Sequence, residues 1–270
     1  MFRKLVKPAP SNEMKLKLRV YLTQAAIGIV LIAVWQGVTS FHLTDPSLLP
    51  SPATVAVTIG QLSNSQTFIE NAGNTVLRVA VAFAIGAPLA LIVGFVMGEN
   101  VAVGKSLGPI FNVVLAVPQS IFLPIFVLLL GLGFTEKVMF GITHVFFVVV
   151  VNTMAAVREV PHAYAVAARS FGANRLRIYR SIYLPAMAPH VMTGLRFGLI
   201  FDIIGILLAE MYAAQSGLGL LLSKWGENMD VGKLMAATIL ISIATVLANE
   251  GMRLWETRVS RWQRAMEAAS

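Results

Sequence analysis

The sequence predicts an all-α membrane protein with about six transmembrane helices. Of its 270 residues, 57% are hydrophobic and only 13% are charged, whereas about a quarter of the residues in a soluble domain are charged. The mean hydropathy is +0.75. A chain of this length accommodates one membrane domain of several helices and leaves little for a soluble domain. Lipid is therefore the expected solvent for much of the chain.

Mostly apolar stretches of about 20 residues, the length that crosses a bilayer, occur at six places. Pro118 and Pro124 interrupt the third, so we expect a kink or break there, with neighbouring helices satisfying the freed carbonyl groups. The basic segment 1–17 precedes an apolar stretch without an obvious small-residue cleavage site, so we interpret the first span as uncleaved. The six expected spans are 18–40, 74–97, 107–130, 137–157, 189–213 and 233–256.

The basic residues are distributed unevenly between the two sides of such a bundle. With both ends of the chain in the cytoplasm, sixteen of the twenty-one lysines and arginines lie inside, and Arg78 and Arg196 lie near span ends. Only Lys137, Lys224 and Lys233 lie outside. This asymmetry orients membrane proteins during insertion. It also accounts for the net charge of +8, which therefore does not indicate nucleic-acid binding.

The spans divide the rest of the chain. Residues 41–73 form an extracytoplasmic loop with a proline-rich turn and then a short amphipathic helix at the membrane surface. Residues 74–256 form the core domain, and residues 257–270 form a cytoplasmic tail. Rows of small residues four apart within two of the spans are expected to pack helices closely together. These rows are Ala82, Gly86, Ala90, Gly94 and Gly98, and His190, Gly194, Gly198 and Asp202.

No pattern for covalent chemistry is present. The sequence lacks cysteine, H-E-x-x-H and G-x-S-x-G, and its four histidines are widely scattered, so we expect no catalytic residue and no metal site. GENVAVGKS, residues 98–106, has one residue too many for the phosphate-binding loop G-x-x-x-x-G-K-[ST] and follows a membrane helix instead of a strand. We interpret it as a turn, so this chain is expected to bind no cofactor.

A long polar loop, residues 158–188, separates the fourth and fifth spans. Pro161 suits the first turn of a helix, residues 162–171 are good helix formers, and Gly172 suits the C′ position after the helix. A second helical segment follows and is expected to break at Pro185 and Pro189. The first helix has a small apolar face made of Ala163, Val166, Ala167 and Phe171.

An ordered helix with a low apolar face fits a groove on another protein. A helix resting on the bilayer surface, held by its arginines, is the alternative. The pattern A-A-x-x-x-G, followed by a hydrophobic residue and L-P, occurs here as Ala167, Ala168 and Gly172, then Leu184 and Pro185. It resembles the "EAA" loop of the permease subunits of bacterial ABC importers.

Other stretches resemble the nitrate/sulfonate/taurine branch of that family, in the same order. The similarity extends from about residue 45 to about residue 260 and includes LLPSPATV at 48–55, 74–99, 123–138, 193–199 and 209–219. The family's glutamate before the alanine pair is replaced by Val166. A charged contact from that position is therefore absent in this chain.

The resemblance implies a type I ABC importer permease fold in the bacterial inner membrane, with both termini cytoplasmic. It also implies two permease copies, an extracytoplasmic solute-binding protein, and partner ATPase subunits that carry ATP and Mg. The loop would form the coupling helix, which sits in a cleft of the ATPase. The implied solute is a small anion such as a sulfonate or a nitrate-like ion, although the branch also includes carriers of pyrimidine-type vitamin precursors. The implied coupling residues are Ala167, Ala168, Arg169, Gly172, Leu184 and Pro185.

Polar residues within the spans are candidates for the solute pathway or its gates, because a carboxylate in the bilayer is costly and usually faces the bundle interior. Glu210 lies near the outer end of its span and Asp202 lies deeper, while Gln119 and His144 are more typical of interhelical hydrogen bonds. An alternative function is an autonomous secondary transporter driven by protons through Asp202 and Glu210. The absence of a visible inverted repeat argues against it, and an intramembrane enzyme would need a nucleophile and base that the sequence does not offer.

Overall fold

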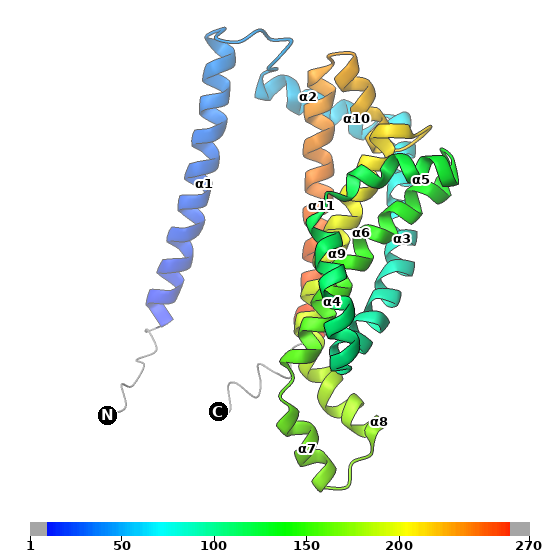
Figure 1. Ribbon diagram of the computed structural model, residues 1–270. Coiled ribbons are helices and arrows are strands. Elements are labelled where there is room, and N and C mark those ends of the chain that lie inside the picture. The colour runs from blue at the N-terminus through cyan, green and yellow to red at the C-terminus, as the bar shows by residue number, and fades with distance from the viewer. Residues whose placement is uncertain (1–9, 260–270) are drawn as a thin grey trace.

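The computed structural model describes residues 10–259, and this part of the chain is helical, with no strand. Figure 1 shows a bundle of long helices with α7 and α8 projecting from one end. In chain order the elements are α1 (Pro10–Ser40), α2 (Pro52–Ser63), α3 (Gln66–Glu99), α4 (Val101–Ala116), the 3₁₀ helix η1 (Gln119–Phe122), α5 (Leu123–Leu130), α6 (Phe134–Glu159), α7 (His162–Ser170), α8 (Arg175–Ile178), the π-helix η2 (Tyr179–Tyr183), α9 (Leu184–Ala213), α10 (Leu218–Glu227) and α11 (Val231–Val259).

Five of these helical stretches are long and apolar enough to cross a membrane, and a bent pair makes a sixth. The all-α membrane class is therefore confirmed. The bent pair is the third expected span, where α4 meets η1 and α5 at 87°. Pro118 cannot continue α4 because it lacks an amide hydrogen. Pro124 begins α5 instead of interrupting it, since the first turn of a helix needs no such donor.

The turn between α3 and α4 is a single residue. Asn100 caps α4, its side chain accepting hydrogen bonds from the amides of Ala102 and Val103 at 3.0 and 3.2 Å. Gly104, Lys105 and Ser106 of GENVAVGKS lie inside α4. The segment is thus a helix–turn–helix junction and has no loop that could surround a phosphate.

The close contact between α3 and α6 forms the centre of the bundle. The small residues of α3 face α6, as the sequence predicts, and leave no room for larger ones. A Cβ added to Gly94 would lie 2.7 Å from the Thr153 Cβ, and one added to Gly98 would lie 2.5 Å from the Val157 Cβ. Backbones this close gain dispersion contacts that lipid cannot replace.

The helix α9 covers another side of α6 in the same way. A Cβ on Gly194 would lie 2.6 Å from the Asn152 Cβ, and one on Gly198 would lie 2.5 Å from the Val149 Cγ2. The two glycines of the second predicted row therefore also serve packing, whereas His190 is largely exposed and contacts Glu159. Together, α3, α6 and α9 form a three-helix unit whose spacing is set by glycine and alanine.

At the end of the bundle opposite α7, the short helix α2 packs against α10 and α11. Its buried Val55 and Leu62 join Leu218 and Leu221 of α10 in one apolar cluster. The helix α1 stands apart from the bundle and reaches it only through this region (Figure 1). There the Trp35 indole donates to the Pro50 carbonyl at 3.0 Å.

The expected break before the fifth span is wrong. A continuous helical run extends from Arg175 through α8, η2 and α9. A π-helical turn precedes Pro185, and Pro189 lies inside α9. A proline in a helix lacks a donor and its ring crowds the preceding turn. The wider π turn relieves this crowding, so the polar loop and the fifth span are joined rigidly.

The packing of α3 on α6 predicts that Gly94→Ala separates the two helices. Overpacking of this kind costs about 1–3 kcal/mol, which should appear as a lower unfolding temperature of the detergent-solubilised protein. The matched control is Gly73→Ala in the same helix, because a Cβ there would meet no atom within 4 Å. Equal unfolding temperatures for the two variants would contradict the close-packing interpretation.

Candidate functional site

The helix α7 ends in a defined hydrogen-bonded turn. The Gly172 amide donates to the Arg169 carbonyl at 2.9 Å, and the Ala173 amide donates to the Ala168 carbonyl at 3.0 Å. This pair of bonds is the Schellman motif, which places the C′ residue in the left-handed region. Gly172 has φ of +76°, a conformation that L-residues with a side chain rarely adopt. The predicted helix end is confirmed.

The apolar face of α7 points away from the bundle. Phe171 is 91% exposed, whereas Ala165, on the other side of the helix, is 1% exposed. Ala163, Val166 and Ala167 are exposed with Phe171. A hydrophobic side chain left this open, on an ordered helix, marks a surface that another molecule can cover.

The other residues of the A-A-x-x-x-G and L-P pattern lie in two different helices. Arg169 is exposed and Ala168 is half-buried on α7. Leu184 and Pro185 form the first turn of α9 and are not part of α7. The pattern therefore describes both the projecting helix and the start of the span that carries it.

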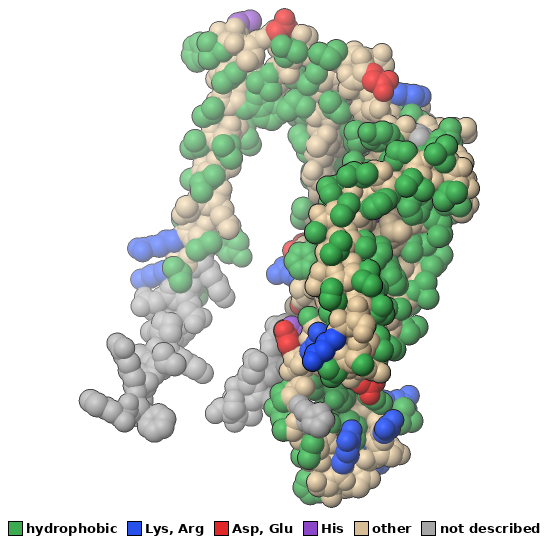
Figure 2. Space-filling view, viewed as in Figure 1, with side chains coloured by type: hydrophobic (Ala, Val, Ile, Leu, Met, Phe, Trp, Pro, Cys, Tyr) green, Lys and Arg blue, Asp and Glu red, His purple; other side chains and the backbone are tan. Residues whose placement is uncertain are grey.

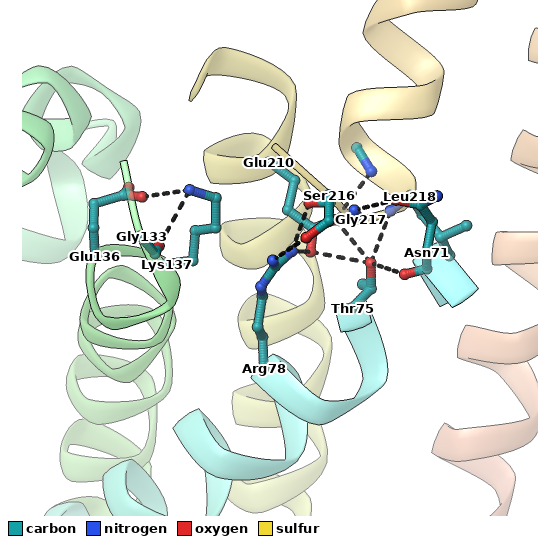
Figure 3. Close-up of polar contacts among 11 residues, drawn as sticks. Asn71, Thr75, Arg78, Gly133, Glu136, Lys137, Glu210, Ser216, Gly217 and Leu218 are labelled. Atoms are coloured by element: carbon teal, nitrogen blue, oxygen red, sulfur yellow. Dashed lines mark hydrogen bonds and ion pairs between the residues drawn. The ribbon is translucent and has the colours of Figure 1, made fainter. Parts of the chain in front are cut away.

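A buried polar network joins α3 to the segment between α9 and α10 (Figure 3). The Arg78 guanidinium contacts the Glu210 carboxylate at 2.5 Å and also donates to the carbonyl and the hydroxyl of Ser216, each at 2.7 Å. The Thr75 hydroxyl donates to Glu210 at 2.8 Å. The Gly219 amide donates to the same carboxylate at 3.0 Å. Glu210 is fully buried and satisfied.

The same network fixes the backbone that follows α9. The Gly217 amide donates to the Asn71 side-chain oxygen at 2.6 Å, and the Leu218 amide donates to the Thr75 hydroxyl at 2.8 Å. The sequence placed Glu210 near the outer end of its span, but Arg78 was missed as its partner. The detectable pattern was a polar stripe, Asn71, Thr75 and Arg78, at i, i+4 and i+7 of an otherwise apolar span.

The charge distribution suggested that Lys137 lies in an outer loop, but the structure places it inside the bundle. It is 1% exposed within α6, and its ammonium lies 2.9 Å from the carboxylate of the fully buried Glu136 (Figure 3). Adjacent residues of opposite charge can be inserted as a pair, because the partner offsets part of the desolvation cost. The expectation that Lys137 lies outside is therefore wrong, because Glu136 accompanies it into the bundle.

No hydrogen bond joins the remaining pathway candidates, His144, Gln119 and Asp202, to one another within residues 10–259. His144 is buried, and its Nδ1 lies 3.0 Å from the Phe140 carbonyl of its own helix, so the expected interhelical hydrogen bond is wrong. Gln119 borders an apolar cavity of about 240 Å³ between η1 and α6. Both oxygens of the buried Asp202 lack a hydrogen-bond partner within residues 10–259. Asp202 faces Gly141, where an added Cβ would lie 2.6 Å from its Oδ1.

The buried network predicts strongly coupled mutations. Arg78→Met leaves a buried carboxylate without its cation, a change that costs about 3–5 kcal/mol when a buried ion pair is broken. The double variant Arg78→Met/Glu210→Leu replaces both charges by apolar groups and should lose less than the two single variants combined. Thermal unfolding of the solubilised protein measures this coupling. Strictly additive losses would show that the two side chains do not act as a pair.

Comparison with known proteins places this arrangement in a family. The chain is 29% identical over 238 residues to the taurine transport system permease protein TauC of Escherichia coli, covering 86% of each chain. It is 26% identical to the putative aliphatic sulfonates transport permease protein SsuC of Bacillus subtilis, covering 88% of this chain and 86% of that one. The formylaminopyrimidine transport permease protein ThiX of Halalkalibacterium halodurans is 23% identical, with 87% and 94% covered.

The fold also matches a solved structure. The MetNI methionine ABC transporter in an inward-facing conformation superposes with a TM-score of 0.60 at 17% identity, over 72% of this chain and 95% of that one. This likeness identifies the type I importer fold. Residues 86–264 match the family described as the binding-protein-dependent transport system inner membrane component. The match spans more than half of the sequence, so the chain belongs to this family of ABC importer permeases.

Proposed function

We propose that this chain forms the translocation pathway of an ABC importer and receives force from a partner ATPase through α7. The exposed apolar face of α7, ended by the Gly172 turn, carries the proposal. Exposed hydrophobic surface on a rigid helix suits docking into a groove. ATP and Mg would be bound by the partner, and ATP binding there would move α7.

The proposed orientation places α7 and both termini in the cytoplasm. Basic side chains support it, since Figure 2 shows most of those on the visible face gathered near α7 and at the lower part of α1. Cytoplasmic segments are enriched in lysine and arginine. The end with α2 and α10 would then face an extracytoplasmic binding protein, and the protein would lie in a bacterial inner membrane.

We further propose that two copies of the chain line one pathway and that the solute is a small anion of the sulfonate class. Similarity to the taurine permease TauC and to the putative aliphatic sulfonates permease SsuC supports this solute class. The formylaminopyrimidine permease ThiX is similar over a comparable length, so the test includes competition between taurine and a pyrimidine for uptake. The proposed homodimer is what the resemblance to the permease family implies. We propose no catalytic step for this chain.

Docking through α7 predicts that Ala167→Arg lowers binding-protein-dependent taurine uptake about tenfold or more, the effect of about 1.4 kcal/mol at an interface. Ala167 is exposed, so the bundle should still fold. Uptake into proteoliposomes containing permease, ATPase and binding protein measures the effect, and copurification measures docking. The matched control is Ala102→Arg, another exposed alanine at this end of the bundle. Normal copurification and uptake with Ala167→Arg would refute the docking role.

The left-handed turn after α7 predicts opposite outcomes for two substitutions at Gly172. Asparagine tolerates this conformation, whereas an ordinary L-residue loses about 1–2 kcal/mol there, or about five- to thirtyfold in population. A β-branched residue is disfavoured more strongly. Gly172→Val should therefore uncouple ATP hydrolysis from uptake, and Gly172→Asn should largely preserve coupling. No other atom lies near a Cβ at this position, so crowding cannot explain a difference.

A further inference from the structure

Tyr179 of the polar loop contacts the last two turns of α3. Tyr179 of η2 donates its hydroxyl hydrogen to the Glu99 carboxylate, the last residue of α3. Its ring also meets the Phe95 ring edge-on, with the ring centres 5.6 Å apart. These two contacts tie the stem of the loop to two successive turns of one helix.

Glu99 occupies a position where a carboxylate needs such partners. The C-terminal end of a helix carries a partial negative charge that disfavours an acidic side chain. Here the Tyr179 hydroxyl bonds to the carboxylate, and a small cavity of about 60 Å³ beside it is lined by Arg169 of α7 and Arg175 of α8. The projecting helix thus contributes a charge next to the same carboxylate.

Two non-helical stretches connect α7 to the rest of the chain. Between α6 and α7 lie Val160 and Pro161, both with extended backbone (ψ of 117° and 123°), so the helix does not continue from one to the other. Phe171 to Asn174 separate α7 from α8, and from Arg175 the helical run continues through α8 and η2 into α9 without a break. On this second side, a displacement of α7 first meets the continuous helical run that contains Tyr179, and Arg169 of α7 lines the same small cavity as Tyr179 and Glu99.

The helix α3 carries that displacement to the opposite end of the bundle. It is 34 residues long and lies close against α6 along its small-residue row. Its other end holds Ser216 and Gly217 through Arg78 and Asn71. The position of α10, which follows directly, is therefore tied to α3.

We propose that Tyr179 and Glu99 are positioning residues that form the joint through which movement of α7 reaches α3 and, at its far end, α10. The inference rests on the proposed coupling to an ATPase. Breaking the joint leaves docking and ATP hydrolysis intact but weakens the response of α10. Loss of a coupling free energy in the usual range changes such a response about five- to 150-fold.

The response of α10 can be observed directly, because the chain has no native cysteine. Lys224 is exposed on α10, so Lys224→Cys can be labelled with an environment-sensitive fluorophore before assembly with the ATPase. The full complex in lipid is then mixed with ATP and Mg, and fluorescence and ATP hydrolysis are recorded together. Tyr179→Phe, which keeps the ring contact with Phe95, should reduce the fluorescence change about fivefold or more at unchanged hydrolysis.

Three further variants separate the joint from a general loss of stability. Glu99→Gln retains an acceptor oxygen and should keep most of the response, whereas Glu99→Ala should lose it. Tyr179→Phe/Glu99→Ala should be no worse than either single variant, since both remove one bond. The control is Tyr183→Phe, whose ring packs beside Tyr179 with centres 5.7 Å apart and which should respond normally.

The outcomes are distinguishable. A normal fluorescence response in Tyr179→Phe, with hydrolysis intact, overturns the joint and leaves the proposed function standing. Additive losses in the double variant overturn it as well, because the two residues would then act separately. A labelled chain with Tyr179 intact that does not assemble with the ATPase, or does not respond to ATP, overturns the proposed function and the inference with it.

Discussion

Close contact between α3 and α6 is the constraint on which the rest of the molecule depends. Lipid offers helices no hydrophobic reason to associate, so association relies on packing that small residues permit. With Gly94 and Gly98 nearly touching Thr153 and Val157, α3 has one position along α6. That position determines where its two polar ends lie: Glu99 beside the projecting loop, and the Arg78 stripe beside the segment after α9. The contact at each end is possible because the middle is fixed.

The two ends differ in how polar groups are satisfied. At the α10 end, Arg78 and Glu210 are buried, and an ion pair out of water is tolerated only when further hydrogen bonds complete it. Thr75, Ser216 and the Gly219 amide provide those bonds. At the α7 end, Glu99 and the arginines near it are exposed, so water replaces any contact that breaks. The buried end is therefore a fixed anchor, and the exposed end is one that can be remade at low cost.

Much of the fold could be predicted from the sequence, because the features concerned are local. Long apolar runs predicted the spans. Pro118 predicted the break after α4, and Gly172 predicted the end of α7. The predictions were wrong where the structure depends on a compensating feature elsewhere in the chain. Pro185 did not end a helix because a π turn precedes it, and Lys137 was not in a loop because Glu136 accompanies it into the core. For the candidate site, the helix α7, its apolar face and its end at Gly172 were predicted, whereas the pairing of Arg78 with Glu210 links residues 132 apart in sequence, which periodicity alone cannot assign.

The apolar face of α7 suits the proposed contact with a second protein better than a charged face would. A charged docking surface would be screened by salt and would hold partners over a distance, whereas an alanine-rich face acts only in close contact and depends on shape. Val166, where the resembling family has glutamate, makes this face still less charged. Such a contact transmits movement only while the two surfaces touch. The charged groups near it, Arg169 and Arg175, instead line the cavity beside Glu99. The proposed docking and the proposed transmission thus use different side chains of one short segment, so that each can be altered without the other.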